Sequence, residues 1–147
     1  MSTHKSKALI IRVYEEGMNR KDMRIIYEVF APDYVAHFPG VPPIRGIDAA
    51  KQLIGTFLAV FPDIQFKIED QVAEGDKVAT RWTARGTHRG EFRGFPPKVK
   101  GIPPSGKQVS FTATDIYRIA GGRIMEEWNT LEQLDVLHQI GALPAPE

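Results

Sequence analysis

The sequence contains no cysteine, which excludes disulfides, thiolate metal sites and cysteine nucleophiles. It has no uninterrupted run of about 18 apolar residues, the length that a membrane-spanning helix needs. Neither sign of charge dominates, because 19 Lys and Arg residues stand against 18 Asp and Glu residues. Nucleic-acid binders normally carry a basic excess, so we expect no nucleic-acid partner and no membrane partner. Residues 1–7 lead into an amphipathic segment rather than a signal-peptide core, which predicts a cytoplasmic protein.

The sequence has enough hydrophobic and aromatic residues to form a hydrophobic core. It is 147 residues long, with 42% hydrophobic and 10% aromatic residues. A chain of this length buries roughly 70% of the surface that it exposes when unfolded. We therefore expect one globular domain spanning residues 1–147, with no linker.

The first half of the chain has the apolar spacing of helices. Residues 9–18 and 23–30 each repeat apolar side chains every three or four positions, and Pro32 is expected to stop the second helix. A short strand is predicted at 34–38 and a third helix at 50–61, before Pro62. The order of these elements places helices at the N-terminal end of the fold.

The second half alternates apolar and polar residues, as strands do. Strands are predicted at 64–68, 78–87, 108–119 and 123–130, with tight turns at 74–76 and 121–122. A closing helix is expected from Leu131 to Ile140, ended by Gly141. Helices followed by long antiparallel strands predict an α+β fold.

A long loop interrupts the strands at residues 91–107. It contains a repeated pattern, FRGFPP at 92–97 and VKGIPP at 99–104, whose proline and glycine content excludes a central strand. The loop and its surroundings are also rich in Arg and Lys. It is either a tolerated insertion or the rim of a site, and its charge leaves an anionic ligand as an alternative.

Several short motifs occur in an order and spacing that resemble a known family. They are PDYVAH at 32–37, FPDI at 61–64, GDKV at 75–78, RWT at 81–83, GTHRG at 86–90, YR at 117–118, GRI at 122–124 and HQIG at 138–141, with Glu126 and Trp128. Together they resemble the SnoaL-like polyketide cyclases, also called ester cyclases, of the nuclear transport factor two-like superfamily. The resemblance covers residues 6–141.

The resemblance implies a cone-shaped barrel, in which N-terminal helices close a curved mixed sheet over a deep apolar pocket. It further implies a homodimer formed through the exposed face of the sheet. The described cyclases close a polyketide ester by an intramolecular aldol reaction without a cofactor or metal. Because the superfamily also contains isomerases, hydrolases and binding proteins, the fold leaves the function open.

Three residues in the predicted C-terminal strands are candidates for this chemistry. Asp115 shares the apolar face of its strand with Phe111 and Tyr117, and a carboxylate buried there gains basicity from desolvation. Alternation places Glu127 and Asn129 on one face, so Glu127 and Asp115 are predicted to form a carboxylate pair. By the resemblance, Asp115 stands where studied cyclases have a pocket histidine, and Asn129 stands where they have the catalytic aspartate.

The remaining candidates are aromatic residues and histidines. His37 matches a histidine at the pocket mouth of the family, where it would act in acid–base chemistry or orient the substrate. Pocket contacts are also expected from Tyr14, Trp82, His88, Phe111, Tyr117 and Trp128. His37, Asp115 and Glu127 lack the spacing that is typical of a metal site, so neither a metal nor a cofactor is expected.

The resulting hypothesis is a cofactor-free cyclase, isomerase or lyase acting on a small lipophilic carbonyl or ester compound. Asp115 is the expected base, with Asn129 and His37 polarising or positioning the substrate. The first alternative is a non-catalytic protein that binds a small molecule, which the exchange of the cyclase aspartate for Asn129 favours. The second is a hydrolase of epoxides or esters.

Overall fold

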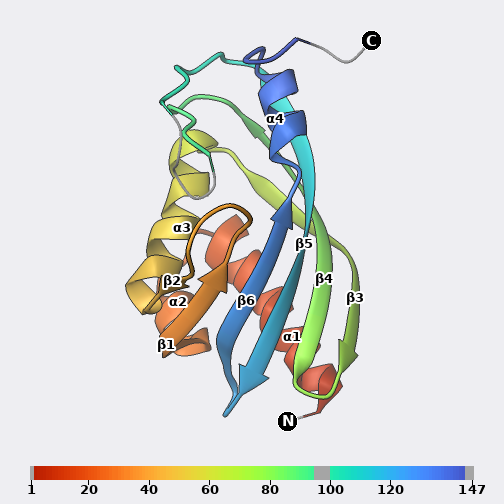
Figure 1. Cartoon of the computed structure of the whole chain (residues 1–147). Helices are drawn as coiled ribbons and strands as arrows, with labels where there is room; N and C mark the ends of the chain where they lie inside the picture. Colours follow the sequence, from red (N-terminus) through yellow and green to blue (C-terminus); the bar gives the residue numbers. More distant parts are fainter. Residues whose placement is uncertain (1, 95–99, 145–147) are drawn as a thin grey trace.

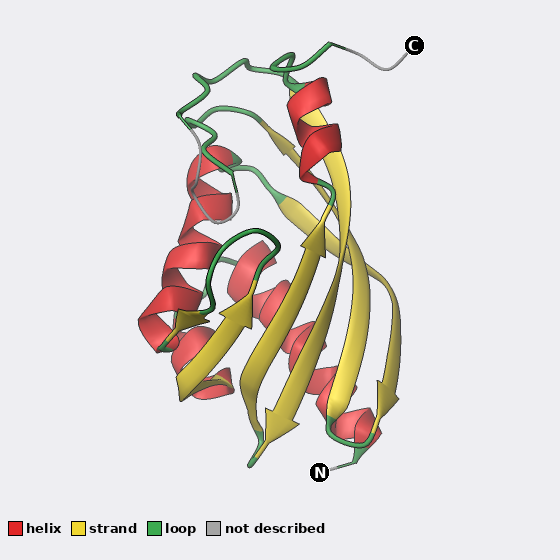
Figure 2. Cartoon of the chain, in the orientation of Figure 1, coloured by secondary structure: helices red, strands yellow, loops and turns green. Residues whose placement is uncertain are grey.

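A computed structural model describes residues 2–94 and 100–144. The helices between residues 3 and 60 lie along one side of a bent, six-stranded mixed sheet, and the C-terminal helix lies against one end of it (Figures 1 and 2). The helices are α1 (Thr3–Arg12), the π-helix η1 (Val13–Asn19), α2 (Arg24–Val29), α3 (Ile47–Val60) and α4 (Gln133–Gln139). The strands are β1 (Phe30–His37), β2 (Ile44–Arg45), β3 (Gln65–Glu74), β4 (Lys77–Thr87), β5 (Gln108–Ala120) and β6 (Arg123–Leu131).

The strand order across the sheet is β2-β1-β6-β5-β4-β3. β1 pairs with β6 in parallel, and every other pairing is antiparallel. The predicted α+β fold with helices over a curved sheet is therefore confirmed. In the described residues β2 and β3 end the sheet without pairing to one another, so helices rather than strands close the cone.

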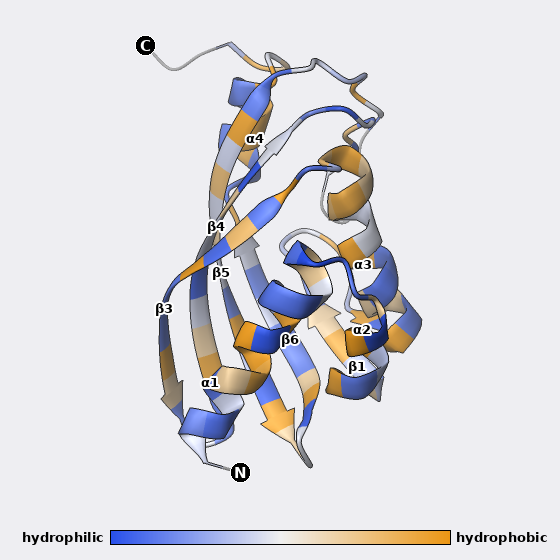
Figure 3. Ribbon diagram, turned by 180° about the vertical axis from the view of Figure 1, so that it is seen from behind, coloured by the Kyte–Doolittle hydropathy of each residue, from blue (hydrophilic) through white to orange (hydrophobic). Residues whose placement is uncertain are grey.

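The N-terminal helices bury one face against the sheet. Ser2 caps α1, because its Oγ accepts a hydrogen bond of 3.1 Å from the Lys5 amide. Figure 3 views the molecule from the side on which these helices lie, and it shows hydrophobic and hydrophilic residues interspersed along them. Helix η1 turns Tyr14 and Met18 inward, and both are buried. None of the helices described is long and apolar enough to cross a bilayer.

The two long hairpins form where the turns predict them. Gly75 has a φ of 58° between β3 and β4, and Gly121 and Gly122 have φ of 58° and 73° between β5 and β6. Both central residues of the β5–β6 turn and the first central residue of the β3–β4 turn thus have positive φ, which suits a tight hairpin and which glycine adopts without strain. Along β5, buried and exposed residues alternate from Gln108 to Tyr117, which gives the sheet an inner and an outer face.

The segment around Pro32 differs from its prediction. The helix before it ends at Val29, and β1 already begins at Phe30, so Pro32 lies inside a strand. The pairing of β1 with β6 shifts register between Phe30 and Val35. Proline has no amide hydrogen to donate, and this irregular stretch tolerates it because the ladder is interrupted there.

The core between helices and sheet is rich in aromatic rings. Phe66 packs against Trp82 with ring centroids 5.1 Å apart, and Phe61 lies 5.5 Å from Phe111. The described part of the 91–107 loop joins this core, because Phe92 is buried and its backbone pairs with that of Ile102. The centre of the loop, residues 95–99, lies outside the described residues.

Candidate active site

A small cavity lies between the inner face of the sheet and the helices. It encloses about 50 Å³. Its lining is mostly apolar, with seven polar or amphipathic side chains on one side. The lining residues are Val13, Tyr14, Met18, Phe30, Tyr34, Phe38, Ala50, Leu53, Ile54, Phe57, Trp82, Asp115, Tyr117, Glu127 and Asn129. None of these is Lys, Arg or His, so among the described residues no cationic side chain lines the cavity beside the two carboxyl groups. A cavity of ~150 Å³ accommodates benzene, so an organic substrate requires the apolar lining to move.

Asp115 lies at the centre of the polar side of the cavity and is 1% exposed. Trp82 Nε1–H donates to its Oδ2 at 2.6 Å, and Asn129 Nδ2–H donates to its Oδ1 at 2.8 Å. The Tyr14 hydroxyl donates to Oδ2 over a longer distance, 3.4 Å. Indole N–H can only donate, so this partner set suits a carboxylate. The charge is therefore held by neutral donors instead of an ion pair.

Glu127 is the second carboxyl group of the cavity. Its side chain is half-buried, and its carboxyl group is turned inward, where the Tyr34 hydroxyl donates to Oε1. Burial raises the pKa of Glu127 well above its usual range, and the charge of Asp115 raises it further. Hydrogen bonds from Tyr34 and Tyr117 oppose this shift without cancelling it. The pair therefore combines a carboxyl group that accepts hydrogen bonds from several donors with one whose protonated form is favoured by burial, an arrangement that acid–base catalysis can use.

Two tyrosine hydroxyls complete the polar side. The Tyr14 and Tyr117 oxygens lie 2.5 Å apart, and both rings are buried. Burial raises the pKa of each phenol well above its ordinary value, and the negative charge of Asp115 adds to the effect. Both phenols therefore stay protonated across the neutral range, and they can serve as hydrogen-bond donors.

Asn129 faces Asp115 directly across the β5–β6 pair. Its side chain is 7% exposed. While Nδ2 donates to Asp115, the Asn129 Oδ1 atom is buried and has no hydrogen-bond partner among the described residues. The cavity thus presents two carboxyl groups and one acceptor atom that has no partner among the described residues.

The structure does not bring His37 into the cavity. Its Nε2 lies 2.6 Å from Glu126 Oε2, and its ring stacks on Trp128 with centroids 5.4 Å apart. Both contacts lie on the outer face of the sheet. Trp128 therefore also lies on the outer face and does not line the cavity. The reason is strand alternation, because Tyr34 and Phe38 on the same segment point inward and leave His37 pointing outward.

His88 and Phe111 are buried but do not line the cavity. His88 Nδ1 accepts a hydrogen bond of 3.1 Å from the Ser105 amide, which ties the two ends of the 91–107 loop together. Burial lowers the pKa of His88, in agreement with a neutral ring that accepts at Nδ1. Phe111 stacks on Phe57 with centroids 6.3 Å apart and belongs to the aromatic core.

Tyr34 and Phe38 are cavity residues that sequence reasoning missed. Tyr34 contacts Glu127, and Phe38 forms part of the apolar wall. The sequence signal for both was weak, because His37 is the one clearly polar residue among positions 34–38; strand alternation still places Tyr34 and Phe38 on one face and His37 on the other. The same alternation, applied to this strand, would have moved His37 to the outer face.

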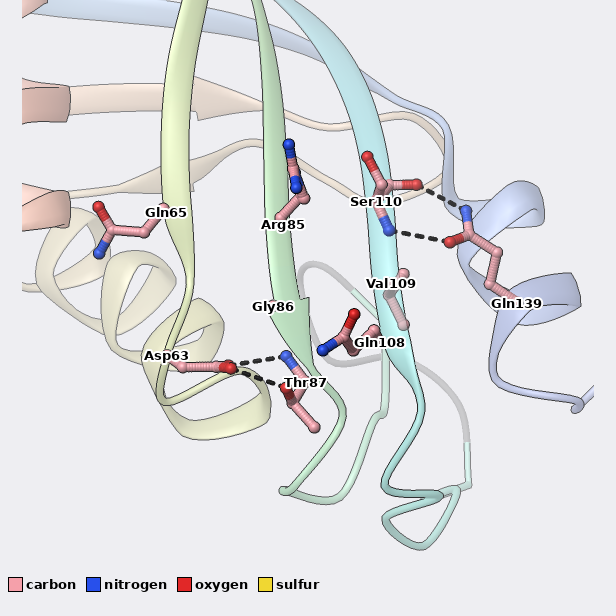
Figure 4. A pocket seen from close by; sticks show the side chains of 9 residues that line it. All are labelled: Asp63, Gln65, Arg85, Gly86, Thr87, Gln108, Val109, Ser110 and Gln139. Carbon is pink, nitrogen blue, oxygen red and sulfur yellow. Dashed lines mark hydrogen bonds between the residues drawn. The ribbon is translucent and has the colours of Figure 1, made fainter.

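A second, larger hollow of about 430 Å³ lies on the outer side of the sheet (Figure 4). The side chains of Asp63, Thr87 and Gln139 in its lining already have hydrogen-bond partners. Asp63 accepts from the amide and the hydroxyl of Thr87, both at 2.7 Å. Gln139 bonds to the backbone of Ser110 at 2.9 Å and 2.6 Å, which ties α4 to β5. These contacts hold the end of the sheet together and leave no acid–base pair in the hollow.

Among the residues described, no three His, Cys, Asp or Glu side chains are grouped in a way that could hold a metal ion. The polar groups that the inner cavity offers to a substrate are carboxyl groups, phenols, an indole and an amide.

The SnoaL-like polyketide cyclase family model matches residues 8–140. No curated protein sequence matches the chain. Among solved structures, AclR from Streptomyces galilaeus, described as a proposed hydroxylase, is 30% identical with a TM-score of 0.84, covering 99% of this chain and 87% of AclR. IdmH from Streptomyces antibioticus, described as a proposed polyketide cyclase, is 34% identical with a TM-score of 0.76, covering 92% and 97%. TsrD from Streptomyces laurentii is 27% identical with a TM-score of 0.82, covering 97% and 99%.

Proposed function

Since the chain belongs to the SnoaL-like polyketide cyclase family, we propose that it performs cofactor-independent acid–base chemistry on a neutral, lipophilic carbonyl or ester compound. The reaction class is an intramolecular aldol closure or a related isomerisation. The observation that carries this proposal is the Asp115–Glu127 pair: the two carboxyl groups line the same apolar cavity, and burial and the charge of Asp115 raise the pKa of Glu127. Such a pair supplies a base and an acid at one pH.

The proton balance of an aldol closure fits this pair. The Asp115 carboxylate takes a proton from the carbon next to a carbonyl group, and the electron pair moves to the carbonyl oxygen as an enolate. The enolate carbon then forms a bond to a second carbonyl carbon of the same molecule. The alkoxide that results takes the proton of Glu127. Transfer of the proton from Asp115 to Glu127 restores the starting state.

The surroundings of the pair favour this sequence. Trp82 and Asn129 hold Asp115 in place with directed hydrogen bonds, and Tyr34 does the same for Glu127. The apolar wall excludes water, which strengthens the electrostatic contacts at the developing charge. Because no cation lines the cavity among the described residues, a neutral substrate is favoured over a free carboxylate.

A hydrogen–deuterium exchange assay tests the proposed proton abstraction. The probe is 1-phenylpropan-2-one in D₂O, and loss of its α-proton signals is followed by NMR. Wild-type protein is expected to accelerate exchange, and Asp115→Asn should lower the rate at least about 100-fold, the lower range of general base catalysis. Glu127→Gln should lower it less, because the amide still donates a hydrogen bond.

Glu126→Gln is the matched control, since its carboxyl group lies on the opposite face of the same strand. Its exchange rate should stay close to that of the wild type. Equal rates for wild type and Asp115→Asn would refute the assignment of the base. A rate lost equally in Asp115→Asn and Glu126→Gln would point to a fold defect, which thermal unfolding of both variants detects.

A second candidate function is the binding of a small apolar molecule without turnover. Two observations favour it: the cavity encloses only about 50 Å³, and Asn129 occupies the position to which the resemblance assigns the cyclase aspartate. Under this alternative, wild-type protein binds the ketone probe without accelerating its exchange. The exchange assay therefore separates the two functions directly.

We also propose that the chain is a single domain that forms a homodimer through the outer face of its sheet. Ile116 and Val72 are 39% and 71% exposed there, and Trp128 is half-buried beside them on the same face. Light scattering is expected to give twice the monomer mass for the wild type. Ile116→Lys should shift that mass toward the monomer, whereas a monomeric wild type would rule the dimer out.

A further inference from the structure

The Asn129 carboxamide has a buried oxygen that nothing in the described structure satisfies. Its Nδ2 donates to Asp115 at 2.8 Å, but Oδ1 has no partner. The side chain is 7% exposed, and it belongs to the lining of the cavity. Buried polar side-chain atoms nearly always have a hydrogen-bond partner, so an exception at a cavity wall points to an occupant.

The orientation of this amide follows from its neighbours. Trp82 Nε1–H, which can only donate, already requires Asp115 to accept. Asn129 therefore meets the same carboxylate with its NH₂ group, and its oxygen is left for another partner. The partner has to be a donor, because an amide oxygen only accepts.

The other polar groups of the cavity already have hydrogen-bond partners within the protein. The Tyr14 and Tyr117 hydroxyls are bonded to one another, and Glu127 is bonded to Tyr34. Asp115 Oδ1 and Oδ2 each hold at least one donor. Asn129 Oδ1 is thus the acceptor with the largest unmet demand beside the proposed base.

We infer that Asn129 Oδ1 accepts a hydrogen bond from a hydroxyl group of the substrate, placed next to the carbon that loses its proton. This inference rests on the proposed function and narrows its substrate class. The substrate is a neutral carbonyl compound that carries an enol or phenol hydroxyl, and O-methylated or deoxygenated analogues are rejected. Asn129 is a specificity-determining residue, whereas proton abstraction belongs to Asp115.

Rejection of the analogue has a simple physical cause. A ligand without the hydroxyl displaces solvent from the cavity and leaves the Asn129 oxygen unpaired in an apolar site. A site that is built to bond a hydroxyl loses much more affinity in that case than a purely apolar pocket does. Selection should therefore be visible with simple ligands that undergo no reaction.

Phenol and toluene are the probes, because they have the same shape and differ in one donor. Binding is followed by ¹H–¹⁵N NMR of the indole groups. The chain has two tryptophans. Trp82 lines the cavity and should shift on binding, while Trp128 on the outer face is an internal control. Wild type is expected to bind phenol at least about tenfold more tightly than toluene, which corresponds to about 1.4 kcal/mol.

Three substitutions of Asn129 decide the assignment. Asn129→Leu and Asn129→Ala remove the acceptor, and the preference for phenol should disappear in whichever of them folds. Asn129→Asp is the matched control, because a protonated carboxyl group there still donates to Asp115 and keeps an acceptor oxygen. It should retain the preference. Circular dichroism melts check that each variant is folded.

The inference is overturned if wild type shows no preference, if neither probe shifts the Trp82 signal, or if the preference survives in Asn129→Leu or Asn129→Ala. It is also overturned if the preference is lost in Asp115→Asn alone, since Asp115 would then be the acceptor. The proposed function fails by a separate result, the absence of α-proton exchange in the wild type. A protein that prefers phenol but exchanges no protons would keep the binding role of Asn129 and lose the catalytic role of Asp115.

Discussion

Glu126 and Glu127 are neighbours on β6, yet they lie on opposite faces of the sheet and meet opposite environments. Glu126 lies on the outer face, where hydrogen bonds to His37 and Arg118 lower its pKa. Glu127 lies on the inner face, where burial and the charge of Asp115 raise its pKa. A single step along a strand thus separates an ordinary surface carboxylate from a candidate general acid.

The two tryptophans repeat this contrast. Trp82 is 2% exposed and donates to the Asp115 carboxylate, whereas Trp128 is half-buried and stacks on His37. Each face therefore contains an acidic group, an aromatic ring and a polar partner. The inner face differs because its carboxyl groups are shielded from water and no described Lys, Arg or His lies beside them. Burial without a cationic partner is what raises the pKa of Glu127 and suits it to acid–base chemistry.

The largest expected effect on stability comes from replacing Trp82, the tryptophan on the inner face. Trp82→Phe removes a core ring volume and the Nε1–H donor of Asp115, so it should lower the free energy of unfolding by about 2–4 kcal/mol. Trp128→Phe keeps an aromatic ring on His37 and should cost less than about 1.5 kcal/mol. Urea denaturation of both variants measures the difference, and equal losses would contradict the contrast between the faces.

The pH dependence of stability should separate the two glutamates next. The folded-state pKa of Glu127 is raised, so the folded protein retains a proton that the unfolded chain releases. Stability from this group is complete below the unfolded pKa of about 4.3 and falls as pH rises through the folded pKa. Each unit of difference between the two pKa values contributes about 1.4 kcal/mol.

Glu127→Gln should remove that loss, so its free energy of unfolding should change less between pH 5 and pH 8 than in the wild type. Glu126 has a lowered folded-state pKa, and its contribution is lost instead as pH falls through that pKa. Glu126→Gln should therefore flatten the acid side of the curve. Urea denaturation at a series of pH values measures both effects. If the free energy of unfolding of Glu127→Gln changed with pH in parallel with that of the wild type, this would count against a raised pKa of Glu127.

The smallest effect is expected for the ion pair on the outer face. Arg118 Nε lies 3.2 Å from Glu126, and both side chains are partly exposed to solvent. Exposed pairs of this kind contribute ~0.2–1 kcal/mol, so Arg118→Gln should change the free energy of unfolding by less than about 1 kcal/mol. High salt should reduce even this difference. If Arg118→Gln lowered the free energy of unfolding as much as Trp82→Phe does, the Arg118–Glu126 pair would be as important to stability as the core.

Much of the fold could be predicted because its patterns are regular. The turns around Gly75 and at 121–122 end strands that alternate over many residues, and β5 places Asp115 on the inner face by parity alone. The same parity on β6 turns Glu127 and Asn129 inward. Long strands define their faces well, because each further residue confirms the register.

Short and irregular segments were harder to predict. β1 contains Pro32 and a register shift, which makes its start and its faces hard to predict, and the sequence placed His37 at the pocket mouth. β2 is two residues long and gave no signal. The roles of Tyr34 and Phe38 depend on how β1 sits beside β6, a long-range pairing that local patterns do not contain.

Site-specific titration of the two neighbouring glutamates tests the central claim most directly. Protein labelled with ¹³C at glutamate carboxyl groups is titrated by NMR, and Glu126→Gln and Glu127→Gln assign the two signals. The Glu127 carboxyl carbon should change its chemical shift at a higher pH than free glutamate does, while that of Glu126 should change at a lower pH than free glutamate does. An ionised Glu127 that titrates together with Glu126 would contradict the proposed acid–base pair.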